Sequence, residues 1–124
     1  MFTINSDLSI YLTRGDIATI VIRAKLSEEE DYTFQIGDIV RFRVLEKNHC
    51  DNVVLSKDVI VEEEATSIDL CLVTEDTKIG DLINKPKDYW YEVELNPDTS
   101  PQTIIGYDQN GPKIFRLYPE GDDN

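Results

Sequence analysis

The feature that most constrains the fold is an apolar run that begins directly after a tight-turn signal, at residues 14–24. Arg14, Gly15 and Asp16 form the turn signal, and the run behind them is rich in β-branched residues, which suit a pleated sheet better than a helix. Alternate positions fall on opposite faces of a strand. The predicted core face carries Ala18, Ile20, Ile22 and Ala24, and the other face carries Ile17, Thr19, Val21 and Arg23.

The same alternation returns along the chain, with turn-forming residues between the segments. Residues 39–47 place Val40, Phe42 and Val44 on one face. Residues 88–96 place Tyr89, Tyr91, Val93 and Leu95 opposite Trp90, Glu92 and Glu94. About eight to ten short strands, spaced roughly 8–12 residues apart, predict an all-β sandwich or barrel. The length of 124 residues predicts a single domain, 1–124.

Local signals predict where the chain turns. A turn at 48–52 separates two strand candidates and predicts a hairpin. Asp108, Gln109, Asn110 and Gly111 contain the Asn-Gly pair, the strongest short-range hairpin signal in the chain, between strands at 102–107 and 112–118. One short helix is expected near 75–83, with Thr74 as its N-cap. The polar residues 119–124 are expected to fray.

Charge and composition exclude several classes of partner. The net charge of −13 argues against nucleic acid, because phosphate binding requires a basic surface. No apolar run approaches the roughly 20 residues of a membrane span. The first residues lack the basic and apolar regions of a signal peptide, so we expect a cytoplasmic or virion protein rather than a secreted one. Cys50 and Cys71 have no metal-site spacing and are expected to be free thiols.

No motif in the chain predicts catalysis, a metal or a cofactor. The acidic runs at 28–31 and 62–64 point consecutive carboxylates in alternating directions, which is typical of solvated loops rather than calcium sites. The only histidine, His49, lies near Asp51 without a nucleophile in a recognisable motif. Arg14, Gly15 and Asp16 also spell an adhesion tripeptide, but their position before an apolar strand favours a turn.

Trp90 is a candidate interface anchor. Alternation places it opposite Tyr89 and Tyr91, so the three rings cannot form one sugar-stacking platform in a regular strand. An outward tryptophan beside acidic residues fits a contact hot spot, and partial burial under a loop is the alternative.

Two blocks of sequence resemble a known family. Residues 12–20 (Leu-Thr-Arg-Gly-Asp-Ile-Ala-Thr-Ile) precede residues 37–44 (Gly-Asp-Ile-Val-Arg-Phe-Arg-Val), in the order seen at the start of small β-sandwich proteins from phage tails. The similarity is to the immunoglobulin-like N-terminal domain of baseplate upper proteins of phages that infect Gram-positive bacteria. A closing block, at 89–95, 102–108 and 113–121, resembles the ends of short prophage proteins with the same beginning. The immunoglobulin Cys–Trp–Cys order is absent, because Trp90 follows both cysteines.

The resemblance implies a fold and a use. The expected fold is an antiparallel, immunoglobulin-like β-sandwich with one short helix near 75–83. The expected function is structural: a non-catalytic component of a phage or prophage tail or baseplate, located in the virion or the host cytoplasm. It would contact other phage structural proteins and form a homo-oligomer. The outward aromatic residues expected to make these contacts are Trp90, Tyr107, Phe115 and Tyr118. The alternative is a carbohydrate-binding module for cell-wall or cell-surface glycans.

Overall fold

The structure, a computed structural model, describes residues 2–4, 8–27, 30–46, 49–80, 84–106 and 111–120. It is built almost entirely of strands, as the sequence predicts. The elements are β1 (Phe2–Ile4), β2 (Ile10–Thr13), β3 (Ala18–Ile22), β4 (Lys25–Ser27), β5 (Glu30–Asp31), β6 (Ile39–Glu46), β7 (His49–Ile60), β8 (Ile68–Leu72), α1 (Thr74–Thr77), β9 (Lys87–Leu95), β10 (Gln102–Ile105) and β11 (Lys113–Tyr118). The one described helix is a single short turn, so no described helix is long and apolar enough to cross a membrane.

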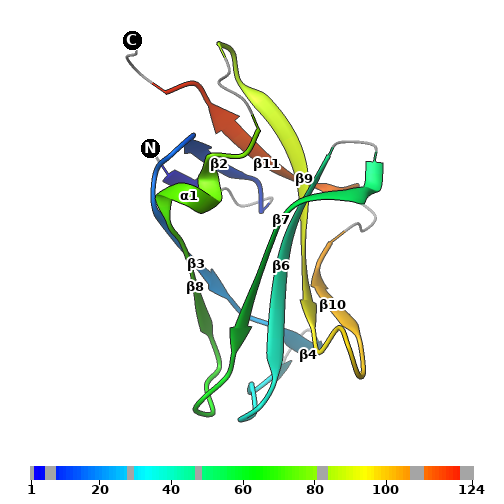
Figure 1. The fold of residues 1–124 in the computed structure, drawn as a ribbon. Helices are drawn as coiled ribbons and strands as arrows, with labels where there is room; N and C mark the ends of the chain where they lie inside the picture. The colour runs from blue at the N-terminus through cyan, green and yellow to red at the C-terminus, as the bar shows by residue number, and fades with distance from the viewer. Residues whose placement is uncertain are drawn as a thin grey trace.

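The strands form two layers around one core. The large sheet has the order β1-β2-β11-β9-β6-β7, and β10 also pairs with β9. A second sheet contains β3 and β8, and a small ribbon contains β4 and β5. The pair β3 and β8 lies apart from the long β6 and β9 strands in Figure 1. Buried side chains from both layers, such as Ile22 and Leu70 facing Phe42 and Val93, belong to one cluster. The arrangement is therefore sandwich-like.

The predicted core faces are confirmed. On β3, Ile20 and Ile22 are 3% and 0% exposed, whereas Val21 between them is 51% exposed. On β9, Tyr89 and Tyr91 are buried, and Trp90 between them is only partly buried. Burial of these apolar side chains supplies the main driving force for closing the two layers.

The expectation of a fully antiparallel fold is wrong at one ladder. β2 pairs parallel with β11, with Ile10 opposite Phe115 and Leu12 opposite Leu117. Hairpin geometry does not constrain this pair, since most of the chain lies between the two strands. The other strand pairs named here, β1–β2, β3–β8, β6–β7, β6–β9 and β9–β11, are antiparallel. The large sheet is therefore mixed.

Among the described residues, the strands on either side of the predicted Asn-Gly turn do not pair with each other as a hairpin. Both β10 and β11 pair antiparallel with β9, β10 near Leu95 and β11 near Trp90. The two strands therefore run in the same direction along one edge of β9. Gly111 has φ +93°, as an Asn-Gly turn requires, and residues 107–110 lie outside the described residues. Pairing with the long β9 outweighs the local preference for reversal.

The other predicted hairpin is confirmed. β6 and β7 pair antiparallel from Ile39 opposite Ile60 to Glu46 opposite His49. The turn is shorter than predicted, because β7 begins at His49 and not after residue 52. The side chains of His49, Cys50 and Asp51 lie outside the described residues. The other cysteine, Cys71, is an exposed free thiol on β8.

The helix is shorter than predicted and begins one residue earlier. Val73 occupies the N-cap position rather than Thr74, and its N–H donates to the Asp76 carboxylate at 2.9 Å. The helix ends at Thr77 because Lys78 leaves the helical conformation and Gly80 adopts φ +69°. Ile79 is buried, as expected, and residues 81–83 lie outside the described residues.

Arg14 ties this helix end to the last described strand. Its Nε donates to the Ile79 carbonyl at 3.3 Å, and its Nη2 donates to the Gly80 carbonyl at 2.6 Å. Its Nη1 forms an ion pair with Glu120 at 2.6 Å. The residue is only 8% exposed, and the Asp16 N–H donates to the Thr13 carbonyl at 3.0 Å, so the turn interpretation of Arg14, Gly15 and Asp16 is confirmed. Glu120 is thereby held in place, so the prediction of fraying from residue 119 is wrong there, and residues 121–124 are not described.

Candidate interaction surface

An aromatic group lies on the outer face of the large sheet, where β2, β9 and β11 are neighbours. The rings of Tyr11 and Tyr118 make an edge-to-face contact with centroids 6.1 Å apart. The Arg116 guanidinium lies 4.6 Å from the centre of the Tyr11 ring. Trp90 lies on the same face of β9, in register with Ile114 on β11. We call Tyr11, Trp90, Arg116 and Tyr118, all of which are half-buried, the aromatic face.

The predicted interface residues divide into three groups. Trp90 and Tyr118 belong to the aromatic face. The prediction that Phe115 points outward is wrong, because its side chain is 0% exposed. Its ring packs against the Phe42 ring in the core, and the two ring centres are 6.1 Å apart. Tyr107 lies outside the described residues. Since Tyr89 and Tyr91 are 1% and 3% exposed, neither is available to share a sugar platform with Trp90.

Charged side chains on this outer face are paired with one another. Arg116 forms an ion pair with Asp88 at 2.6 Å. Arg43 pairs with Glu92 and with Glu94 on the neighbouring strand. Arg41 pairs with Asp58 at 2.8 Å and with Asp98 at 3.2 Å. The guanidinium of Arg41, through its hydrogen bond, holds the pKa of Asp58 below its usual value. A protein docking here would cover few isolated charges, which are the costly ones to bury.

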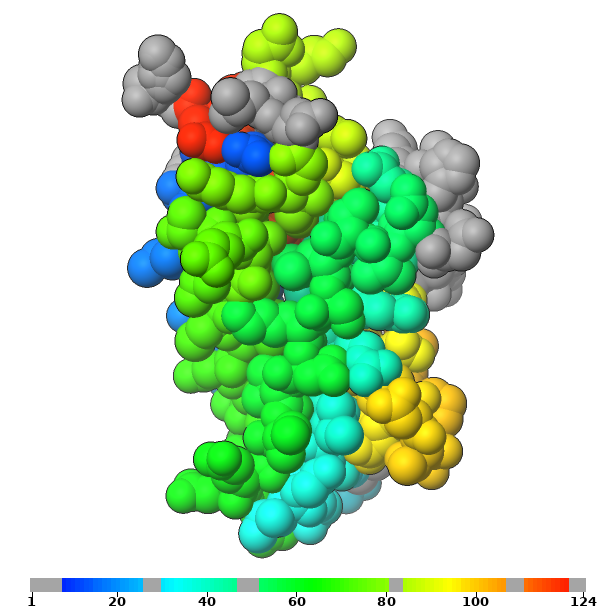
Figure 2. Space-filling model, viewed as in Figure 1, coloured from blue at the N-terminus to red at the C-terminus, as the bar shows by residue number. Residues whose placement is uncertain are grey.

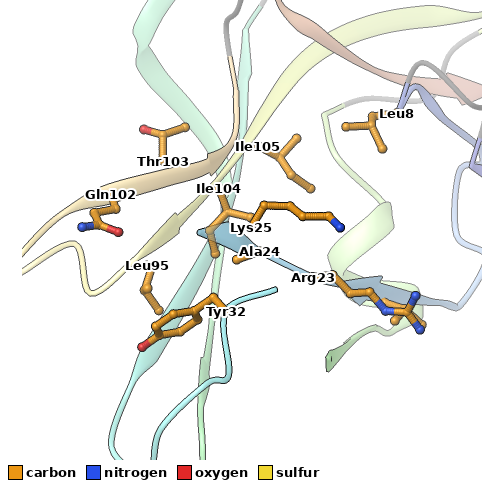
Figure 3. Close-up of a pocket in the computed structure, with 11 residues that line it drawn as sticks. Leu8, Arg23, Ala24, Lys25, Tyr32, Leu95, Gln102, Thr103, Ile104 and Ile105 are labelled. Carbon is orange, nitrogen blue, oxygen red and sulfur yellow. The ribbon is translucent and has the colours of Figure 1, made fainter. Parts of the chain in front are cut away.

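A second surface feature is a groove of about 640 Å³ between the two layers. Its walls come from β10 on one side and from β3 and the start of β4 on the other (Figure 3). Figure 2 shows the segment around β10, in yellow and orange, at one margin of the molecule. The lining is mainly apolar, with two cations: Leu8, Val21, Arg23, Ala24, Lys25, Tyr32, Leu95, Gln102, Thr103, Ile104 and Ile105.

A polar cluster fixes one wall of this groove. The Tyr32 hydroxyl donates to the Asp38 carboxylate at 2.6 Å, and the amide of Asn96 donates to its other oxygen at 3.1 Å. Asn96 also accepts from the Ile39 N–H through its side chain and donates to the Ile39 carbonyl through its backbone. It has φ +49°, a conformation that asparagine tolerates better than most residues. The cluster holds the end of β9 against the start of β6.

The hydrogen bonds of this cluster predict that the stability of the fold depends on pH. Burial raises the pKa of Asp38, but hydrogen bonds from Tyr32, the Gln35 N–H and Asn96 outweigh it, so the pKa lies below its usual value. The hydrogen bond to Asp38 in turn raises the pKa of Tyr32 to about 12. Because the pKa of Tyr32 is higher in the folded protein than in the unfolded chain, its hydrogen bond contributes fully to the free energy of unfolding below pH 10. This contribution is lost as the pH rises toward 12.

We therefore expect an ultraviolet pH titration to show a tyrosine ionisation near pH 12, which we assign to Tyr32. The matched variant Tyr32→Phe should remove this late transition and should lower the pH-dependent loss of stability between pH 10 and 12. A wild-type titration in which no tyrosine ionises near pH 12 would contradict the Tyr32–Asp38 hydrogen bond.

Arg23 differs from the other arginines. Arg14, Arg41, Arg43 and Arg116 each form an ion pair. Arg23 is exposed, lines the groove, and has no ion-pair partner among the described residues. The neighbouring cation, Lys25, pairs with Asp31 at 2.8 Å.

The groove was not predicted from the sequence, although one signal for it exists. Alternation assigned Val21 and Arg23 to the outer face of their strand, which is where both lie. What alternation does not show is that β10 faces β3 across a gap, because that depends on strand pairing far along the chain.

Within the described ranges, no three His, Cys, Asp or Glu side chains gather as a possible metal site. No family model, curated protein or solved structure matches this chain. The interpretation of the surface therefore depends on its own geometry and on the resemblance in the sequence.

Proposed function

We propose that this domain is a non-catalytic assembly component of a phage or prophage tail or baseplate, and that it acts through protein–protein contacts. The observation that carries the proposal is the aromatic face, where half-buried rings lie beside charges that already have partners. Tryptophan, tyrosine and arginine are the residues most enriched at contact hot spots. The phage assignment comes from the resemblance of residues 12–20 and 37–44 to baseplate upper proteins.

The finer fold assignment, an immunoglobulin-like sandwich, is part of the same proposal. If β3, β6, β7, β8, β9 and β11 correspond to strands B, C, C′, E, F and G, their pairing agrees with the variable-type arrangement of the two sheets. The short helix α1 would then occupy the connection between E and F. The N-terminal strands differ, since β1 pairs with β2 in the large sheet.

The test is association with purified particles or with a second copy. Trp90→Ala and Tyr118→Ala are each expected to weaken association at least tenfold, because hot-spot truncations typically cost about 2 kcal/mol or more. The matched control is Ile17→Ala, which trims an apolar side chain that is 71% exposed and directly precedes β3, away from the aromatic face. Co-sedimentation with particles and light scattering measure the two kinds of association.

The control should associate as the unmodified protein does, and far-ultraviolet circular dichroism should show that all variants keep the fold. The proposal fails if the protein is absent from purified particles and stays monomeric at high concentration. It also fails if Ile17→Ala weakens association as much as Trp90→Ala does.

A further inference from the structure

The groove between the layers is bordered by strands with open edges. Among the described residues, β3 pairs only with β8, and β10 pairs only with β9. Val21 of β3 and the four residues of β10 line the groove, and from this we infer that the unpaired edges of the two strands border it. An open edge presents backbone N–H and C=O groups that can pair with an added strand. Natural proteins use this arrangement to bind extended peptides.

The side chains of the groove suit an apolar extended segment. Val21 is 51% exposed and Leu8 is 39% exposed, although both are apolar, so covering them removes apolar surface from water. Ile104 and Ile105 of β10 are partly buried and complete the opposite wall. Figure 3 shows Ile104, Ala24 and Leu95 among the apolar residues that line the groove. Side chains on one face of an added strand would contact this surface.

The charge of the groove is opposite to that of the whole chain. The chain carries −13, yet the charged side chains of the groove are Arg23 and Lys25, both cations. Lys25 forms an ion pair with Asp31, whereas Arg23 interacts with Asp31 only electrostatically and has no ion-pair partner among the described residues, so its guanidinium can take an external carboxylate. A guanidinium binds a carboxylate with two parallel hydrogen bonds. A second copy suits this groove less well than a neutral or basic partner does, because the net charge of −13 on each chain opposes its approach.

We propose that the groove binds an extended, mainly apolar segment of a different protein, which adds as a strand at β3 and places one carboxylate on Arg23. The inference builds on the proposed function, since it names the partner segment of an assembly protein. It concerns a different surface from the aromatic face. The partner protein as a whole would be neutral or basic. It could then bring one carboxylate to Arg23 without strong repulsion from this chain, whose net charge is −13.

The probe is the blocked peptide Thr-Val-Thr-Val-Thr-Glu-Thr-Val, whose valines and glutamate share one face of an extended strand, compared with the same peptide in which Gln replaces Glu. We expect the first peptide to shift the amide NMR signals of residues 18–25 and 102–105 in a saturable way. The Gln peptide should bind about tenfold more weakly, since a hydrogen bond to a charged group is lost. With Arg23→Gln, the two peptides should bind equally.

Two matched pairs of variants make the test specific. Val21→Glu should abolish binding of the Glu peptide, whereas Ile17→Glu, the same charge change at an exposed residue that directly precedes β3 and lies outside the groove, should leave it unchanged. Likewise, Lys85→Gln removes one exposed positive charge elsewhere and should bind as the unmodified protein does.

The inference is overturned if neither peptide shifts these signals at millimolar concentration, or if Ile17→Glu and Val21→Glu behave alike. It is also overturned if the same signals broaden with protein concentration alone, which would make a second copy the occupant. A result that contradicts peptide binding in the groove can be distinguished from a result that contradicts the proposed assembly function. Particle association that depends on Trp90 but not on Val21 or Arg23 removes only the inference about the groove.

Discussion

Phe115→Ala is expected to destabilise the domain by about 3–5 kcal/mol, which is a large part of the total stability of a domain of this size. Phe115 is 0% exposed and contacts the Phe42 ring, which is also fully buried, in the centre of the core. It lies on β11 between β2 and β9, so the cavity would open where three strands meet. Urea unfolding followed by circular dichroism measures the change as a lower midpoint at a similar m-value.

The matched control is Tyr118→Ala on the same strand. Tyr118 is half-buried on the outer face and its described ring contact is with Tyr11, so its loss should cost about 1 kcal/mol. If Tyr118→Ala proved as damaging as Phe115→Ala, Phe115 would not occupy the core.

The misassignment of Phe115 shows where alternation stops being informative. Phe115 and Tyr118 have opposite parity along β11, so in a regular strand they cannot both face outward. Both faces of this strand mix polar and apolar residues, since Lys113 shares a face with Phe115 and Arg116 shares one with Tyr118. Composition therefore does not separate core from surface here. On β3 and β9, where each inward position is apolar, the predicted faces were correct.

Strand pairing was less predictable than the strands themselves. Periodicity reports which face of a segment is buried, and says nothing about its neighbours. The parallel contact of β2 with β11 joins segments from the two ends of the chain. The position of β10 beside β9 overrides a strong local hairpin signal. The groove follows from the same long-range pairing, so only the outward position of Val21 and Arg23 could be read from the sequence.

In the turn at Arg14, the backbone conformation could be predicted from the local sequence, but the partners of the Arg14 side chain could not. The sequence predicted that Gly15 supplies backbone freedom, and its φ of +91° confirms this. The role of Arg14 depends on carbonyl groups about 65 residues away, at Ile79 and Gly80, which no local pattern reveals.

Arg14→Ala should have the second large effect on stability, a loss of about 2–4 kcal/mol. The variant removes the donors to the Ile79 and Gly80 carbonyls and leaves Glu120 without its ion-pair partner. The helix end and the last described strand would lose their common attachment. Arg14→Lys keeps the charge but cannot reproduce the planar fork, so we expect a loss between those of Arg14→Ala and the unmodified protein.

Arg23→Gln provides the control for the loss of one arginine. Arg23 is exposed and has no ion pair within the described part of the chain, so its replacement should change the free energy of unfolding by less than about 0.5 kcal/mol. Glu120→Gln separates the two roles of Arg14, because it removes the ion pair and leaves the hydrogen bonds to the carbonyls. Since the Glu120 side chain is partly exposed, this variant should cost less than Arg14→Ala. If Arg14→Ala unfolded at the same urea concentration as Arg23→Gln, the buried arginine would not hold these segments together, and the short helix would be held by its other contacts, such as the hydrogen bond from Thr77 to the Asp16 carbonyl.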